Sequence, residues 1–140
     1  MADIHKAGLL WIVNDRILLC GKKDSPILIL PGGKMEPGES DVDCLRRELR
    51  EELGEVEALD LTPIGTYVDI TARSKHTPDR TVQIELYRGE LRGEPIASSE
   101  ITELVWFGAH DDRSRLAPSL RNKIVPDLIA RGILRWPVRE

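Results

Sequence analysis

Cysteine is scarce in this chain, and its two copies, Cys20 and Cys44, fit neither a disulfide framework nor a C-x-x-C metal site. Reduced thiols are expected, as is typical of a cytoplasmic protein. Basic residues are not in excess either: the formal net charge is −4, which argues against a nucleic-acid polymer as partner. No apolar stretch approaches the ~20 residues of a membrane-spanning helix. The short apolar segment near the N-terminus does not resemble a signal peptide, so no membrane partner is expected.

Aromatic residues are also few, at 4% of the chain. With so few rings, most are expected to pack in the core rather than to stack on nucleobases. A stacking role stays open for Trp11, Tyr67, Tyr87, Trp106 and Phe107. The histidines have no spacing that indicates a metal site: they are His5, His76 and His110.

The remaining composition is that of an ordinary globular protein, with 41% hydrophobic and 31% charged residues. A length of 140 residues is sufficient to bury a core. Neither internal repeats nor linker-like tracts interrupt the sequence. We therefore expect residues 1–140 to form a single domain.

Short apolar runs between turn residues predict several β-strands. Ala7–Val13 and Ile17–Cys20 flank the turn Asn14–Arg16 and are expected to form a hairpin. Pro26–Leu30 predicts a further strand, which ends at the breaker sequence Pro31–Gly33. Alternation of apolar and polar residues predicts later strands at Pro63–Ile70, Thr81–Leu91 and Glu103–Ala109.

Helical periodicity follows the glycine-containing loop. Ser40 is the expected N-cap and Gly54 the expected C-cap of this helix. Its apolar stripe consists of Val42, Leu45, Leu49 and Leu53. A second helix is expected over residues 120–129, where Pro126 should kink or split it. Helices mixed with hairpin-like strands predict an α/β fold in which helices cover a mixed β-sheet.

The first helix concentrates carboxylates on one side. Glu48 and Glu52 lie one turn apart with Glu51 beside them, and like charges at this spacing repel. They fan out over an arc next to the apolar stripe, and the preceding Gly32 and Gly33 allow a sharp turn toward that arc. Such hard oxygen ligands suit a small divalent cation, Mg²⁺ above all. The alternative, a solvated helix face, is disfavoured by the repulsion and by the glycine loop.

The spacing of these residues resembles the Nudix box. Gly33, Glu39 and the segment Arg47–Gly54 match its fixed positions, and the sequence LPGGKMEPGES resembles its usual lead-in. Glu55 stands where the family prefers a bulky aliphatic residue, and Val56 follows it. The chain is therefore identified as a member of the Nudix hydrolase family, MutT-like in its box. The resemblance implies an α/β/α sandwich with a mixed β-sheet.

The resemblance also implies an activity and a metal site. Nudix hydrolases cleave the diphosphate linkage of a nucleoside diphosphate derivative, using a water activated by a metal. By position, Glu48 and Glu52 would be direct metal ligands, Glu51 would share or adjoin that role, and the carbonyl of Gly32 would be a backbone ligand. Mg²⁺ is the implied cofactor, with Mn²⁺ as an alternative.

Further catalytic roles follow by position. Arg47 would orient the glutamates, and Glu39 would stabilise the junction between loop and helix. The general base stays open between Glu52 and a glutamate from a later loop, as some family members use. Glu100 and Glu103 are the candidates there, with a slight preference for Glu103; an exposed loop carboxylate is the alternative for either.

Substrate contacts are less constrained by the sequence. Lys22 and Lys23 could contact phosphates, as could Gly33 and Lys34 in the glycine loop; a solvated hairpin end is the alternative for the first pair. A second candidate anion contact is the loop that holds Arg73, Lys75, His76 and Arg80.

Two functions are compatible with these patterns. The first is a pyrophosphohydrolase acting on a small nucleotide; dimers are common in the family, and the oligomeric state, a homodimer or another, stays open. The second is a non-catalytic module that binds a nucleotide or metabolite and regulates a partner. Because a binding module has little reason to keep the mutually repelling Glu48, Glu51 and Glu52, the enzyme is favoured.

Overall fold

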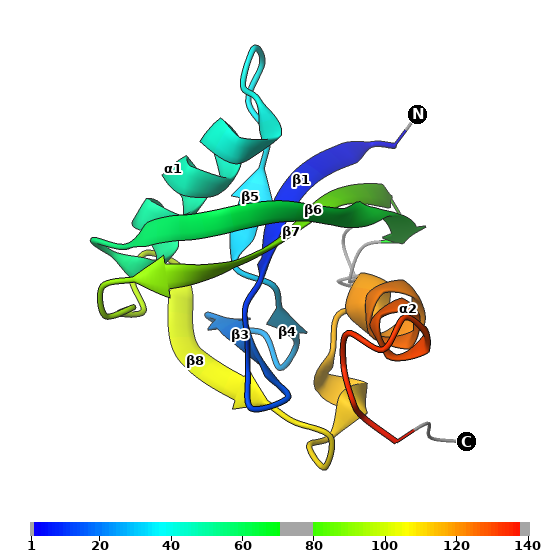
Figure 1. Ribbon diagram of the computed structural model, residues 1–140. Coiled ribbons are helices and arrows are strands. Elements are labelled where there is room, and N and C mark those ends of the chain that lie inside the picture. The colour runs from blue at the N-terminus through cyan, green and yellow to red at the C-terminus, as the bar shows by residue number, and fades with distance from the viewer. Residues whose placement is uncertain (1, 71–79, 138–140) are drawn as a thin grey trace.

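The computed structural model describes residues 2–70 and 80–137, and its strands form two sheets (Figure 1). The first sheet contains, in spatial order, β5 (Gly32–Lys34), β1 (Ile4–Leu10), β7 (Thr81–Arg92) and β6 (Glu57–Ile70). β1 and β7 run parallel while the other neighbours run antiparallel, so the predicted mixed sheet is confirmed.

The second sheet is antiparallel and is built around β3 (Arg16–Lys22). Its other strands are β2 (Ile12–Val13), β4 (Leu28–Ile29) and β8 (Ile101–Phe107). This second sheet is not predicted from the sequence, which indicates strands without showing how they are distributed between sheets.

The apolar run Ala7–Val13 contributes residues to both sheets. β1 ends and β2 begins on either side of Trp11, where the chain passes from the mixed sheet to the antiparallel one. Only β2 forms the predicted hairpin with β3, through Asn14 and Asp15, whose φ angles of 52° and 57° are those of a type I′ turn. The expectation that the whole run pairs with β3 is wrong, because β1 lies between β5 and β7 instead.

The helix α1 (Asp41–Leu53) begins and ends where the sequence predicts. The Ser40 hydroxyl accepts a hydrogen bond from the Asp43 N–H at 3.2 Å, and Gly54 follows the helix with a φ of 82°. Val42, which the periodicity places in the apolar stripe, is only half-buried. The buried face packs with the mixed sheet through Cys44, Leu45, Leu49 and Leu53 on α1 and Ala7 and Leu9 on β1.

The second predicted helix is split, as Pro126 leads us to expect. A π-helix, η2 (Leu120–Ile124), runs directly into α2 (Val125–Ala130), and Pro126 lies in the first turn of α2. Proline has no N–H for the helical ladder and its ring crowds the preceding turn, so the turn widens before it. A short 3₁₀ helix, η1 (Arg113–Arg115), lies between β8 and η2.

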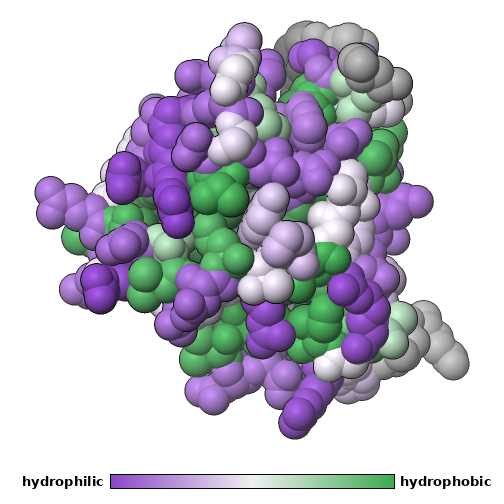
Figure 2. Space-filling view, turned by 45° about the horizontal axis from the view of Figure 1, so that its top comes forward, coloured by the Kyte–Doolittle hydropathy of each residue, from purple (hydrophilic) through white to green (hydrophobic). Residues whose placement is uncertain are grey.

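The two main helices lie on opposite sides of the mixed sheet, which confirms the expected α/β/α arrangement (Figure 1). η2 and α2 pack against the other face of β7, at Val82, Ile84 and Leu86. The face in Figure 2 is mostly hydrophilic, with apolar areas between the polar side chains. Among residues 2–70 and 80–137, no helix combines the length and apolarity that crossing a bilayer requires.

Candidate active site

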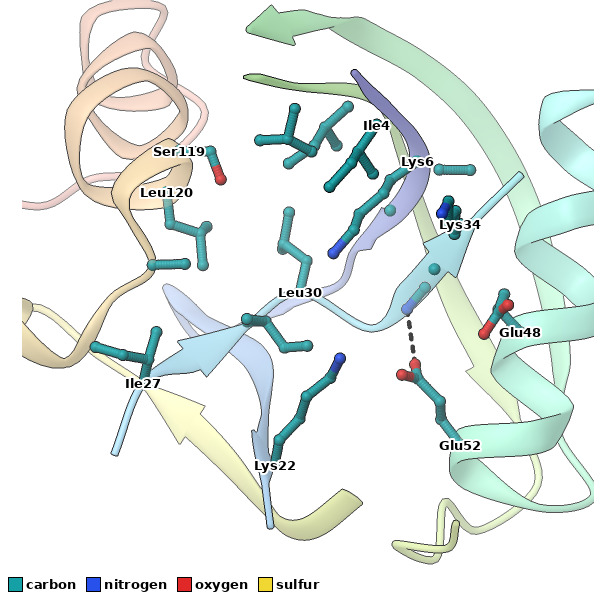
Figure 3. A pocket seen from close by; sticks show the side chains of 18 of the residues that line it. Ile4, Lys6, Lys22, Ile27, Leu30, Lys34, Glu48, Glu52, Ser119 and Leu120 are labelled. Atoms are coloured by element: carbon teal, nitrogen blue, oxygen red, sulfur yellow. Dashed lines mark hydrogen bonds between the residues drawn. The ribbon is translucent and has the colours of Figure 1, made fainter. Parts of the chain in front are cut away.

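A cleft of about 650 Å³ is lined by residues of both sheets, α1 and η2. Its two ends differ in chemistry (Figure 3). The charged end holds Lys6, Lys22, Lys34, Glu48 and Glu52. The aliphatic end lies against η2 and holds Ile27, Leu30 and Leu120, with Ser119 beside them.

Gly32 and Gly33 allow β5 to lie tightly between β1 and α1. Gly32 has a φ of 135°, and a Cβ atom there would lie 2.1 Å from the carbonyl oxygen of Ala7. A Cβ atom on Gly33 would lie 2.4 Å from the carboxyl carbon of Glu48. The position of Gly32 requires glycine because the obstructing atom belongs to the backbone, whereas a side chain at Gly33 would displace the Glu48 carboxylate. The glycine loop therefore turns against the acidic face of α1, as the sequence predicts.

Glu52 is a buried carboxylate at the charged end of the cleft, 9% exposed. Its Oε1 accepts a hydrogen bond from the Gly32 N–H at 2.9 Å. Burial raises the pKa of Glu52 to about 7; the Gly32 N–H opposes this rise, and the nearby Glu48 adds to it. A carboxyl group that titrates near neutral pH inside a cleft is typical of a functional site.

Arg47 connects the loop before α1 to the acidic face. Its guanidinium donates to both carboxylate oxygens of Glu39, at 2.6 and 2.9 Å. It also donates to Glu48 Oε1 at 2.8 Å and to the Lys34 carbonyl at 3.1 Å, and it lies 3.5 Å from Glu51 Oε1. The hydrogen bonds from Arg47 lower the pKa of Glu39 to about 2, so this carboxylate stays ionised. These are the contacts expected of a residue that orients the glutamates.

Of the four glutamates that line the cleft, Glu48 and Glu52 have different partners in the structure. Glu48 is bound to Arg47 and Glu52 to the Gly32 N–H. Accordingly, the described part of the chain contains no group of three His, Cys, Asp or Glu side chains already gathered as a metal site. The chemistry of the donors nevertheless fits a hard divalent cation, because all are carboxylates facing one cleft and a cation would offset their repulsion.

The two later glutamates lie in different places. Glu100 lines the cleft, and its backbone carbonyl accepts a hydrogen bond from the Lys23 N–H at 3.0 Å. Glu103 is exposed, as Glu100 is, but it does not line the cleft; its Oε1 accepts a hydrogen bond from Arg115 at 3.0 Å. The structure therefore gives the preference for Glu103 no support and places Glu100 in the same cleft as Glu52.

The lysines predicted to contact phosphates also differ in whether they line the cleft. Lys22 and Lys34 line the cleft, whereas Lys23 is exposed and does not. Lys6 on β1 also lines the cleft and is not among the residues predicted from the sequence. Burial lowers the pKa of Lys6, as does the charge of Lys22, while the charge of Glu52 opposes this. The one signal in the sequence is a lysine directly before the apolar run that begins at Ala7.

No aromatic side chain of residues 2–70 and 80–137 lines the cleft. Trp11 and Trp106 pack edge to face with centroids 5.0 Å apart, and Phe107 packs with Trp136 at 5.8 Å. The hydroxyls of the two tyrosines bind acidic side chains: Tyr67 donates to Asp127 and Tyr87 to Asp41. These rings therefore serve packing in the structure rather than the cleft.

The second candidate anion contact is only partly described. Arg73, Lys75 and His76 lie outside the described residues, and Arg80 is exposed.

The model of the NUDIX domain family matches residues 4–128 of the chain. YvcI of Bacillus subtilis strain 168, described as an uncharacterised Nudix hydrolase, is 30% identical over 98 residues, which cover 70% of this chain and 61% of that protein. A protein of the same strain with the provisional name 8-oxo-dGTP diphosphatase is 44% identical over 54 residues, which cover 39% of this chain and 36% of that protein. The chain thus spans less than two thirds of the length of these curated relatives.

Among solved structures, the solution structure of the E. coli ORF135 protein is similar, with a TM-score of 0.61 and 30% identity. The match covers 94% of this chain and 90% of that one. The overall fold is therefore shared over nearly the whole length of both.

Proposed function

Because the chain belongs to the NUDIX domain family, we propose that it hydrolyses the diphosphate linkage of a nucleoside diphosphate derivative, either a (d)NTP or a nucleoside diphosphate joined to another group. The observation that carries the proposal is the buried carboxyl of Glu52, which faces a cleft shared with Glu48 and Glu51. Carboxylates that repel each other in a cleft cost stability, and such a cost is typical of a catalytic site.

Hydrolases of this family generally use divalent metal ions. In our proposal Glu48, Glu51 and Glu52 hold the cation, with the Gly32 carbonyl as a backbone ligand. Mg²⁺ is the proposed ion and Mn²⁺ the alternative. A bound cation would supply charge neutralisation on the phosphate oxygens and would lower the pKa of a bound water. Arg47 keeps Glu48 and Glu51 on this side of the helix through its contacts with both.

A water that attacks phosphorus must lose a proton, and a carboxylate in the cleft can accept it. Glu52 and Glu100 both line the cleft. A carboxylate that holds a divalent cation is not free to take the proton, so we assign proton acceptance to Glu100. Glu103, paired with Arg115 at the surface, has no part in this assignment.

The rest of the cleft is suited to the remainder of a nucleotide. Lys22 and Lys34 bring positive charge to the end where the phosphates would lie. The aliphatic end, with Leu30 and Leu120, can take the less polar part of the substrate. The free, buried thiols of Cys20 and Cys44 support a cytoplasmic location.

The proposal is tested with a panel of (d)NTPs, 8-oxo-dGTP, ADP-ribose, nucleotide sugars and dinucleoside polyphosphates, each assayed with Mg²⁺ and with Mn²⁺. We expect at least one member to be cleaved at its diphosphate linkage. Excess EDTA should abolish this activity, and added Mg²⁺ should restore it. Activity that persists in EDTA would contradict the metal-dependent mechanism, and binding without cleavage of any member would favour the non-catalytic module.

A further inference from the structure

Two ammonium groups reach the cleft from different sheets. Lys6 comes from β1 of the mixed sheet and Lys22 from the end of β3 in the antiparallel sheet. Figure 3 shows both side chains extending into the cleft beside the hydrogen bond between Gly32 and Glu52. Both lysines are half-buried, and each lies in a strand rather than in a loop.

Neither ammonium group has an ion-pair partner within residues 2–70 and 80–137. Three carboxylates of the cleft have other partners: Arg47 holds Glu48 and lies near Glu51, and the Gly32 N–H holds Glu52. The fourth, Glu100, forms no ion pair with Lys6 or Lys22. Holding two cations together in a partly desolvated cleft costs free energy through lost hydration and through repulsion. A ligand anion between the two lysines would offset both costs.

The distribution of charged side chains in the cleft limits which anions can bind there. Lysines and glutamates line the same cleft, yet the closest approach of Lys6 or Lys22 to Glu52 exceeds the distance of an ion pair. A group that satisfies both sets of charges must present anionic oxygens to the lysines and a cation to the glutamates. A diphosphate group that carries a divalent cation has this composition, whereas a monocarboxylate does not.

We propose that Lys6 and Lys22 together form a two-sided site for the diphosphate group of the ligand, and that Lys6 is a substrate-binding residue outside the Nudix box. The identity of the ligand as a nucleotide rests on the proposed function. The choice of a diphosphate that carries a divalent cation rests on the proposed metal site as well. The binding of an anion by Lys6 and Lys22 does not, because it follows from two unpaired cations that share one cleft.

A structural role for Lys6, as a distant counter-ion of Glu52, makes the opposite prediction for stability. A counter-ion stabilises the free protein, so its removal would lower the melting temperature. If Lys6 instead binds a ligand anion, removal of its unpaired charge should leave the melting temperature of the ligand-free protein unchanged or higher. The two roles can therefore be separated without an activity assay.

The test is a calorimetric titration of the full chain with inorganic pyrophosphate in the presence of Mg²⁺. Lys6→Met keeps the length of the apolar stem and removes the charge; Lys123→Met is the matched control, because Lys123 is exposed and does not line the cleft. We expect Lys6→Met to weaken binding at least about tenfold, as loss of a charge-assisted hydrogen bond does, and the control to bind as the wild type does. Lys6→Arg should retain most of the affinity.

Unchanged affinity in Lys6→Met would overturn the anion site even if the wild-type protein hydrolyses nucleotides. A lower melting temperature of Lys6→Met without ligand, together with unchanged affinity of the folded fraction, would assign Lys6 the structural role instead. Conversely, weakened pyrophosphate binding in Lys6→Met alongside a wild-type protein that cleaves no nucleotide would uphold the anion site and refute the proposed hydrolase.

Discussion

Replacement of Glu52 by glutamine is expected to lower turnover of the substrate by at least about a hundredfold while the fold stays intact. The glutamine oxygen can still accept the hydrogen bond from the Gly32 N–H, but the amide is a poor ligand for a divalent cation. Glu55→Gln is the matched control, since Glu55 is exposed one residue beyond the end of the same helix and its cap. Turnover of Glu52→Gln near that of the wild type would remove Glu52 from the catalytic role.

The same substitution should stabilise the metal-free protein in a manner that depends on pH. The pKa of Glu52 is about 7 in the folded protein, against an ordinary value of 4.5. Below the ordinary value Glu52 is protonated in both the folded and the unfolded chain, so it costs nothing. As the pH rises toward 7 the unfolded chain ionises first, and the folded protein loses stability by up to ~3 kcal/mol.

Unfolding by urea in EDTA, at pH 5 and at pH 8, measures this effect. We expect Glu52→Gln to be more stable than the wild type at pH 8, and the difference to shrink at pH 5. A difference that is the same at both values would contradict the account of Glu52 as a buried carboxyl whose ionised form burial disfavours.

Gly32→Ala is expected to destabilise the protein by about 3 kcal/mol or more, and to lower the melting temperature by roughly 10 °C. The new Cβ atom would lie 2.1 Å from the Ala7 carbonyl oxygen, and the backbone at a φ of 135° suits glycine alone. The atom in the way belongs to the backbone of β1 in the middle of the mixed sheet, so it cannot move aside as a side chain would.

Gly38→Ala is the matched control for the backbone angle. Gly38 has a φ of 82°, but nothing lies within 4 Å of its would-be Cβ atom, so we expect a cost of only about 1 kcal/mol. Thermal unfolding of both variants makes the comparison. If Gly32→Ala cost no more than Gly38→Ala, β5 would not lie against β1 as closely as the structure has it.

Features that depend on neighbours in the sequence are the ones that could be predicted. The caps of α1, Ser40 and Gly54, act within one helical turn, so local residue types suffice to place them. The contact of Arg47 with Glu51 follows from helical spacing in the same way. The effect of Pro126 on the last helix is likewise local.

Features that depend on pairing between distant strands could not be predicted. The division of one apolar run into β1 and β2 is invisible in its composition, because both sheets bury the same kinds of residue. The choice between Glu100 and Glu103 depends on the register of β8 against β3, which shifts next to Gly21. Glu103 lies opposite Gly21, where the missing side chain leaves room for it outside the cleft.

Lys6 is a residue of the site that could not be predicted, for the same reason. A lysine in a strand is ordinarily solvated, and only the packing of the antiparallel sheet beside β1 makes its position part of a cleft. The sequence therefore identifies the acidic residues of the site and two of its lysines, Lys22 and Lys34, whereas the place of Lys6 beside them becomes visible only in three dimensions.

The most direct measurement is a crystal of the protein soaked in Mn²⁺, with the ion located by its anomalous scattering. The account predicts one or more ions at the charged end of the cleft, bound by carboxylate oxygens of Glu48 and Glu52 with Glu51 sharing or adjoining them. If saturating Mn²⁺ left Glu48 on Arg47 and Glu52 on the Gly32 N–H, with no ion between them, the metal site and the hydrolase built on it would be contradicted.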